Sequence, residues 1–119
     1  MNQAIIDKHM FSVWSETDRE KRRAAIDEVY AKDCLVYDPM FQDPFLGRSR
    51  LMDLIDNVQM QFPGFVFRIE SYDTHHQSVR LRWSYGIPGE PPAVTGEDFM
   101  LFEGDHIQTM YIYIDRPSG

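Results

Sequence analysis

Cysteine is almost absent from this sequence: Cys34 is the one cysteine among 119 residues, which excludes an internal disulfide. It lies in the segment DCLVYD among residues typical of a strand, where a small buried thiol is a commoner role than a nucleophile. Long apolar runs are missing too. None approaches the roughly 20 residues of a membrane-spanning helix, and Asp7 and Lys8 interrupt the segment where a signal peptide needs an unbroken apolar core. We therefore expect a cytoplasmic protein.

Positive charge is scarce. Twelve Lys and Arg residues stand against nineteen Asp and Glu residues, giving a formal net charge of -7. This charge repels phosphate backbones and anionic lipid head groups, so nucleic acid and membrane surfaces are not expected partners. The four histidines show no metal-ligand spacing, since His75 and His76 are adjacent and face opposite ways in an extended chain. We expect no metal site and no cofactor.

What the sequence does contain is typical of a globular protein. Hydrophobic residues make up 43%, aromatic residues 13% and charged residues 26%, and no low-complexity tract or linker interrupts them. A chain of this length removes roughly two thirds of its unfolded surface from water, which is enough for a true core. The sequence predicts a single domain over residues 1–119.

Helical periodicity dominates the first half. One apolar helical face is formed by Ile5, Ile6, His9, Met10, Val13 and Trp14. Thr17 and Glu20 in TDRE have the spacing of a capping box, and the helix that follows is expected to bury Ile26, Val29 and Tyr30. After Gly47 a third helix is expected, which ends at Pro63-Gly64. Its apolar face is formed by Leu51, Leu54, Ile55, Val58 and Phe62.

From residue 65 onward the period falls to two, which predicts four long antiparallel strands joined by hairpins, the last with a two-residue turn at Gly104-Asp105. In the third of these strands Asp98 shares its parity with Gly96 and Met100, so it should point toward an apolar interior. Phe99 and Leu101 have the opposite parity and leave an apolar stripe on the other face. We expect a homodimer through that face.

Taken in order, several weak motifs resemble one family. They are Tyr30-Ala31-Lys32-Asp33, Asp38-Pro39, Gly47, Phe62-Pro63, Gly96-Glu97-Asp98 and Gly104. Together they resemble the SnoaL-like branch of the nuclear transport factor 2-like superfamily, over almost the whole chain. The resemblance implies an α+β cone-shaped fold, with three N-terminal helices packed on a long curved antiparallel sheet around an internal pocket. It does not fix a function, because this fold hosts enzymes and noncatalytic binding modules alike.

The resemblance also implies catalytic roles. In the related ketosteroid isomerases, the Asp of the corresponding Asp-Pro step removes a proton beside a carbonyl, and a buried Asp donates a hydrogen bond to the enolate; Asp38 and Asp98 hold those two positions. Asp98 could instead accept a bond from a neighbouring Tyr or Trp and only join strands. Trp14 replaces the tyrosine of the isomerase oxyanion hole, and its indole can donate one hydrogen bond or simply fill the core. Asp43 is interpreted as a turn residue. Gly96 stands where limonene epoxide hydrolases carry an arginine, which disfavours direct epoxide hydrolysis.

The leading hypothesis is an acid-base enzyme of isomerase, cyclase or dehydratase type that acts on a small apolar carbonyl or hydroxyl compound. Two alternatives remain open: a noncatalytic module that binds a small hydrophobic molecule, and a dimeric interaction module whose pocket is filled by its own side chains. Seven further residues are expected to shape the cavity and exclude water: Tyr37, Phe41, Met60, Phe62, Trp83, Met100 and Ile112.

Overall fold

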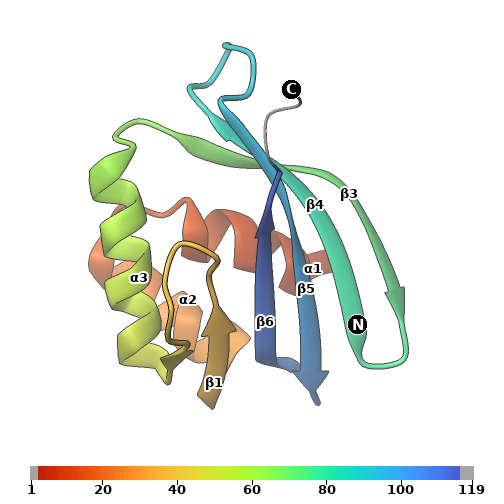
Figure 1. Ribbon diagram of the computed structural model, residues 1–119. Coiled ribbons are helices and arrows are strands. Elements are labelled where there is room, and N and C mark those ends of the chain that lie inside the picture. Colours follow the sequence, from red (N-terminus) through yellow and green to blue (C-terminus); the bar gives the residue numbers. More distant parts are fainter. Residues whose placement is uncertain (1–2, 116–119) are drawn as a thin grey trace.

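The computed structural model describes residues 3–115. Its helical segments are α1 (Gln3–Asp7), the π-helical segment η1 (Lys8–Trp14), α2 (Arg19–Val29) and α3 (Arg48–Gln61). Two strands, β1 (Tyr30–Tyr37) and β2 (Phe45–Leu46), lie between α2 and α3. Four longer strands follow: β3 (Val66–His75), β4 (Ser78–Gly86), β5 (Val94–Glu103) and β6 (His106–Ile114). The α+β class and the order of helices before long strands are confirmed (Figure 1).

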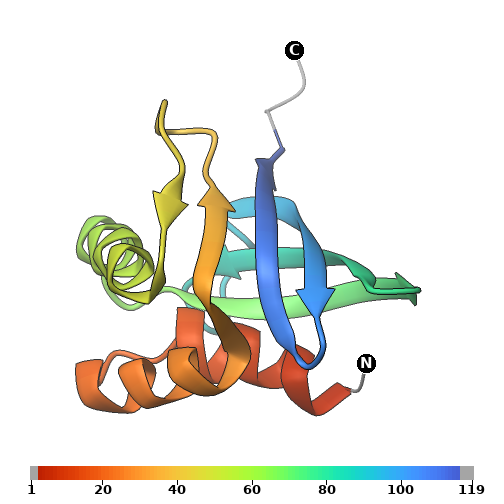
Figure 2. The same cartoon turned by 90° about the horizontal axis from the view of Figure 1, so that it is seen from below.

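All six strands belong to one sheet, in the order β2-β1-β6-β5-β4-β3. Strands β3 to β6 form the predicted antiparallel meander, and Gly104 adopts a φ of +61° in the two-residue turn between β5 and β6. Outside this meander, β1 pairs in parallel with β6 and antiparallel with β2. The sheet twists strongly, so that β3 and β4 run across the direction of β1 and β6 (Figure 2).

The second helix differs from the prediction at both ends. Its N-cap is Asp18, whose carboxylate accepts hydrogen bonds from the backbone N–H groups of Glu20 and Lys21, and not Thr17. At the other end Val29 is the last helical residue, and Tyr30 begins β1. The guanidinium of Arg48 donates to the carbonyl oxygen of Tyr30 at 2.8 Å, so this helix end is satisfied from α3.

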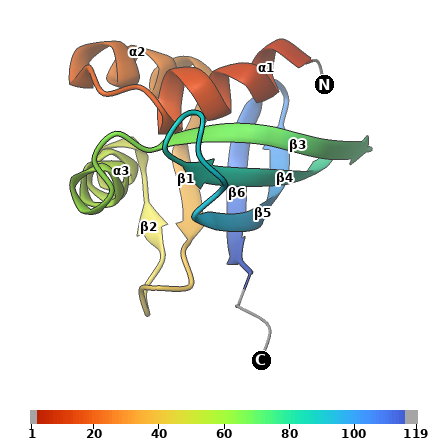
Figure 3. The ribbon, with the colours of Figure 1, turned by 90° about the horizontal axis from the view of Figure 1, so that it is seen from above.

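Side chains of α3 fasten it to the other helices. Asp56 accepts hydrogen bonds from Arg19 and from the buried Arg22 of α2, at 2.8 Å for Arg22. The amide of Gln59 donates to the backbone carbonyl oxygens of Trp14 and Glu16. Figure 3 shows α1 and α2 along one face of the sheet, with α3 beside β2 and β1. These bonds hold α3 at a fixed distance from the end of η1.

The π-helical geometry of η1 aligns two residues that an α-helix would separate. The backbone N–H of Ser15 donates to the carbonyl oxygen of Met10, five residues earlier, at 3.1 Å. Residues five apart in an α-helix point about 140° away from each other. In η1, His9 and Trp14 both face inward and both reach the hydroxyl group of Tyr30. The segment therefore places two polar side chains at one buried point.

Gly96 in β5 is required by the packing of Trp83. A Cβ atom at position 96 would collide with the indole ring of Trp83 and with the backbone carbonyl oxygen of Tyr113. The Trp83 ring therefore lies directly against the backbone of β5, with its N–H directed at Asp98. This packing explains why position 96, the neighbour of Asp98 on the same face of β5, is a glycine.

Within residues 3–115, no helix is long and apolar enough to cross a membrane. The cytoplasmic location stays a prediction from the sequence.

Replacing Gly96 by Ala is expected to destabilise the protein by about 3 kcal/mol, because neither a buried indole nor a strand carbonyl can yield to the added methyl group. Gly104→Ala is the matched control, since a Cβ there meets open space and the positive φ alone costs about 1 kcal/mol. Urea denaturation followed by circular dichroism measures both. An equal loss of unfolding free energy in the two variants would show that the space beside Gly96 can accommodate a methyl group.

Candidate active site

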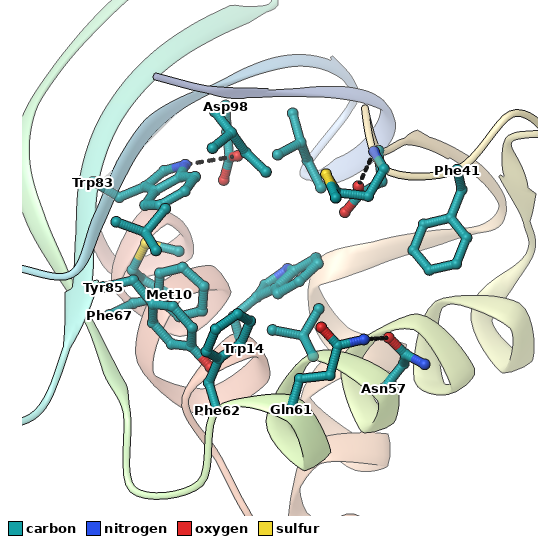
Figure 4. Close-up of a pocket in the computed structure, with 16 residues that line it drawn as sticks. Met10, Trp14, Phe41, Asn57, Gln61, Phe62, Phe67, Trp83, Tyr85 and Asp98 are labelled. Carbon is teal, nitrogen blue, oxygen red and sulfur yellow. Dashed lines mark hydrogen bonds between the residues drawn. The ribbon is translucent and has the colours of Figure 1, made fainter. Parts of the chain in front are cut away.

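A cavity of about 490 Å³ opens between the helices and the concave side of the sheet. Figure 4 shows Asp98 and Trp83 on one side of it and Asn57 and Gln61 of α3 on the opposite side. The walls are mainly apolar, with six aromatic side chains: Trp14, Phe41, Phe62, Phe67, Trp83 and Tyr85. The other lining residues are Met10, Asp38, Met40, Asn57, Val58, Gln61, Val94, Asp98, Ile112 and Ile114. Asp38 and Asp98 are the charged residues of this set.

Asp38 lies just beyond β1 and is 9% exposed. Its Oδ1 atom accepts a hydrogen bond from the backbone N–H of Met40 at 2.8 Å, and its carbonyl oxygen accepts one from Phe41. Its Oδ2 atom has no hydrogen-bond partner in the described part of the chain. Burial raises the pKa of Asp38, the charge of Asp98 raises it further, and the Met40 N–H opposes both.

Asp98 is 3% exposed, as its strand parity predicted. Both of its carboxyl oxygens are engaged: Oδ1 accepts from the indole N–H of Trp83 at 3.0 Å, and Oδ2 lies 3.0 Å from Nε2 of His9. His9 is fully buried in η1 and continues the contact to the hydroxyl of Tyr30, which lies 2.6 Å from its Nδ1. The indole N–H of Trp14 in turn donates to the Tyr30 hydroxyl at 3.0 Å.

The contacts from Trp14 through Tyr30 and His9 to Asp98 form a hydrogen-bond chain. The direction of its hydrogen bonds follows from its Trp14 end, because an indole N–H can only donate. Trp14 supplies a proton to the Tyr30 oxygen, and burial raises the pKa of Tyr30 well above its usual range, so the phenol keeps its own proton. Among residues 3–115, that proton has one acceptor within hydrogen-bonding distance, Nδ1 of His9. His9 then carries its single proton on Nε2 and donates it to Asp98. Asp98 is therefore the acceptor at which the chain from Trp14 and the bond from Trp83 both end.

Two catalytic roles expected from the sequence do not agree with this geometry. Asp98 accepts from two N–H groups, which is how a carboxylate binds and not how a neutral hydrogen-bond donor binds. The alternative in which Asp98 accepts a bond from a neighbouring Trp describes its contacts correctly. Trp14 contributes its ring to the cavity wall, but its one N–H is used by Tyr30. Neither group is placed to donate a proton to a bound molecule.

Tyr85 is a donor that the sequence reasoning left out of the site. It lines the cavity from β4, is 4% exposed, and its hydroxyl has no hydrogen-bond partner among residues 3–115. Burial raises the pKa of Tyr85 to about 12, so the hydroxyl keeps its proton at neutral pH. Its strand parity, shared with Trp83, was the signal that could have identified it.

Of the residues predicted to line the cavity, four do so: Phe41, Phe62, Trp83 and Ile112. Three do not. Tyr37 lies on the opposite face of the sheet and stacks on Tyr111, with ring centroids 4.5 Å apart. Met60 is 80% exposed because it lies on the outer side of α3. Met100 points inward but is fully buried in the core and does not reach the cavity.

Other candidate residues lie away from the cavity. Asp43 is exposed, and the turn bond expected of it is made by Asp38 instead. His75 and His76 lie at the hairpin of β3 and β4 and do not line the cavity. No group of three potential ligand side chains converges on a metal site within residues 3–115.

Comparison with known proteins agrees with this architecture. A family model described as the SnoaL-like domain matches residues 8–110. The chain belongs to this family. Comparison with curated proteins gives no match.

Solved structures share the fold of this SnoaL-like domain. A proposed isomerase of the SnoaL-like family from Agrobacterium tumefaciens has a TM-score of 0.85 at 22% identity, covering 95% of this chain and 96% of the other. A proposed polyketide cyclase from Sinorhizobium meliloti has a TM-score of 0.73 at 16% identity, covering 93% and 94%. A protein with a ketosteroid isomerase-like fold from Catenulispora acidiphila, solved with trimethylamine, has a TM-score of 0.76 at 17% identity, covering 95% and 86%. At these identities the likeness shows the fold.

Tyr30→Phe in this SnoaL-like domain is expected to lower the free energy of unfolding by about 2 kcal/mol or more, because it leaves the buried Trp14 N–H and Nδ1 of His9 without a partner. Tyr113→Phe is the control, since Tyr113 is 57% exposed and should change stability little. Chemical denaturation of both variants tests this. A Tyr30→Phe protein as stable as the parent would contradict the assigned chain.

Proposed function

We propose that this SnoaL-like domain is an acid-base enzyme of isomerase, cyclase or dehydratase type, acting on a small apolar carbonyl or hydroxyl compound in the cavity. One observation carries the proposal: two carboxyl groups border the same apolar cavity in unlike environments. Both oxygens of Asp98 are held by N–H donors, whereas Oδ2 of Asp38 has no hydrogen-bond partner among residues 3–115 and burial raises the pKa of Asp38. Asp38 therefore combines an available carboxyl oxygen with a raised pKa, and both properties suit a general base.

Asp38 takes the role of the base. Its free Oδ2 atom removes a proton from a carbon beside a carbonyl group, and its raised pKa brings its basicity closer to what proton transfer near neutral pH requires. In an isomerisation, the same carboxyl group then returns the proton to a different carbon. The bond from Met40 holds the carboxyl plane in place during both steps.

Tyr85 takes the role that sequence reasoning gave to Asp98 and Trp14. When Asp38 removes the proton, negative charge moves onto the carbonyl oxygen, and the Tyr85 O–H is the buried donor free to stabilise it. The mainly apolar walls lower the local polarity, which strengthens that hydrogen bond. Asp98 supplies a fixed negative charge in the same cavity and does not donate.

Asp38→Asn is expected to reduce turnover by about 10² to 10⁴-fold while preserving the fold, because an amide can still accept the Met40 bond but cannot remove a proton. Incorporation of deuterium from D₂O into a panel of small ketones, followed by NMR, measures proton removal without a known product. Asp43→Asn is the matched control, since Asp43 is exposed and lies outside the cavity. Exchange at the uncatalysed rate in both the parent and Asp38→Asn would favour a binding module without chemistry, and equal catalysed rates would exclude Asp38 as the base.

Tyr85→Phe should lower the same exchange rate by about 10² to 10³-fold, the usual effect of removing one donor to an oxyanion. Stability should change little, because the Tyr85 hydroxyl bonds no other group within residues 3–115. A Tyr85→Phe enzyme that keeps its full rate would remove Tyr85 from the mechanism. The contrast with Tyr30→Phe separates a functional hydroxyl from a structural one.

We also propose that the protein forms a two-fold homodimer through the outer face of β5 and β6. Exposed apolar side chains gather there: Phe99 pairs across the strands with Tyr111, while Leu101 and Tyr113 extend the same face. Self-complementary apolar faces of this kind are typical of isologous contacts.

Sedimentation at micromolar concentration is expected to give about twice the 14.0 kDa chain mass. Leu101→Lys should shift the protein toward the monomer, because it places a charge in the apolar face. Met60→Lys, on the exposed side of α3, is the control that should leave the mass unchanged. A parent protein that sediments as a monomer would exclude the dimer.

A further inference from the structure

The cavity carries negative charge that no lining residue neutralises. Asp38 and Asp98 both border it, and none of the residues that line it, all of them within residues 3–115, is Lys, Arg or His. Asp98 raises the pKa of Asp38 through its charge, so the two carboxyl groups interact electrostatically across the site. A neutral ligand would leave this repulsion in place, whereas a cation would relieve it.

His9 does not supply the missing positive charge. It is the basic side chain in contact with Asp98, but its Nδ1 atom accepts the Tyr30 proton and only Nε2 carries a proton. An imidazole with one protonated nitrogen is neutral. Each oxygen of Asp98 accepts one hydrogen bond from the protein, and a carboxylate oxygen can accept a second. Asp98 therefore retains both charge and acceptor capacity toward the cavity.

The walls around Asp98 suit a cation with an apolar body. Trp83 and Trp14 line the cavity together with four other aromatic side chains, and the negative faces of aromatic rings attract ammonium groups. Figure 4 shows the Trp83 indole beside Asp98 and the aromatic rings of Phe62, Phe67 and Tyr85 below it. A purely hydrocarbon ligand would need the aromatic walls but not the two carboxyl groups.

A second buried polar group is also left for a ligand. Tyr85 lines the cavity, and its buried hydroxyl has no hydrogen-bond partner among the described residues, although burying such a group unpaired is unfavourable. A ligand that bears a polar group besides its cation would satisfy it. The site thus offers an anionic acceptor at Asp98 and a neutral donor at Tyr85, separated by apolar walls.

We propose that the substrate is a small apolar compound that carries a protonated amine, with its ammonium group bound by Asp98 and the surrounding aromatic rings. The proposal rests on the proposed function in taking the same cavity as the substrate site. It leaves Asp38 as the base and Tyr85 as the donor to the substrate oxygen. The ammonium N–H groups donate to the second acceptor positions of Asp98, and the apolar body contacts the aromatic walls.

A charge series of ligands of one size tests the proposal at equilibrium, without turnover. The probes are benzylamine, benzyl alcohol and benzoate, titrated separately into the parent protein at neutral pH by isothermal calorimetry. Benzylamine is expected to bind about tenfold or more tightly than benzyl alcohol, since ammonium-aromatic attraction adds to the carboxylate contact in a mainly apolar site. Benzoate is expected to bind weakest, because it adds a third negative charge.

Variants locate the effect. Asp98→Asn should lower benzylamine affinity about tenfold and leave benzyl alcohol affinity within about twofold. Asp38→Asn should shift benzylamine affinity in the same direction by less. Asp43→Asn removes the same charge outside the cavity and should change neither affinity. Circular dichroism of each variant checks folding, and if Asp98→Asn does not fold, Asp38→Asn and the ligand series on the parent protein still decide.

Three results would overturn the proposal. Benzyl alcohol could bind as tightly as benzylamine, or benzylamine could fail to bind at millimolar concentration. The third is an equal loss of benzylamine affinity in Asp43→Asn and Asp38→Asn. These outcomes are separate from the failure of the proposed function. A protein that prefers benzylamine, but whose parent and Asp38→Asn forms both exchange ketone protons only at the uncatalysed rate, would be a cation-binding module. A protein without that preference but with Asp38-dependent exchange would be an enzyme for neutral substrates.

Discussion

The indole N–H groups of Trp14 and Trp83 can only donate, and this constraint sets the direction of every hydrogen bond between them. Protons run from Trp14 through Tyr30 and His9 to Asp98, and from Trp83 to Asp98 directly. The arrangement leaves one group, the Asp98 carboxylate, as the common acceptor. Because a partly satisfied buried network is costly, each of these side chains depends on the others.

The same network connects the fold to the cavity. It joins η1 to β1, β4 and β5, which are far apart in the sequence, and the π-helical geometry of η1 lets His9 and Trp14 meet one hydroxyl. Gly96 allows the Trp83 ring to lie against β5 so that its N–H reaches Asp98. Asp38 and Tyr85 stand outside the network, and in the described part of the chain each has a polar atom without a hydrogen-bond partner. The cavity thus contains one carboxylate fixed by the network, Asp98, and two polar side chains outside the network, Asp38 and Tyr85.

Local pattern was enough to predict much of this arrangement. Alternation in β5 placed Asp98 inward, and the run of strands after residue 65 predicted the meander and its last turn. Contacts between residues distant in sequence could not be predicted. Nothing in the sequence around Tyr30 or His9 indicates that these two side chains, 21 residues apart, are in contact. Parity also cannot tell core from cavity, as Met100 and Asp98 share a face but only Asp98 lines the space. The sequence also did not indicate that Tyr37 lies on the opposite face of the sheet, where its ring stacks on Tyr111.

The central claim is that Asp98 is an anion in the cavity whose charge His9 does not cancel. Nitrogen-15 NMR of the His9 imidazole at neutral pH tests it most directly, because protonated and unprotonated ring nitrogens have well-separated chemical shifts. The account predicts one protonated nitrogen, Nε2, with Nδ1 unprotonated and accepting from Tyr30. Two protonated nitrogens would mean that His9 and Asp98 form a neutral ion pair, and would contradict it.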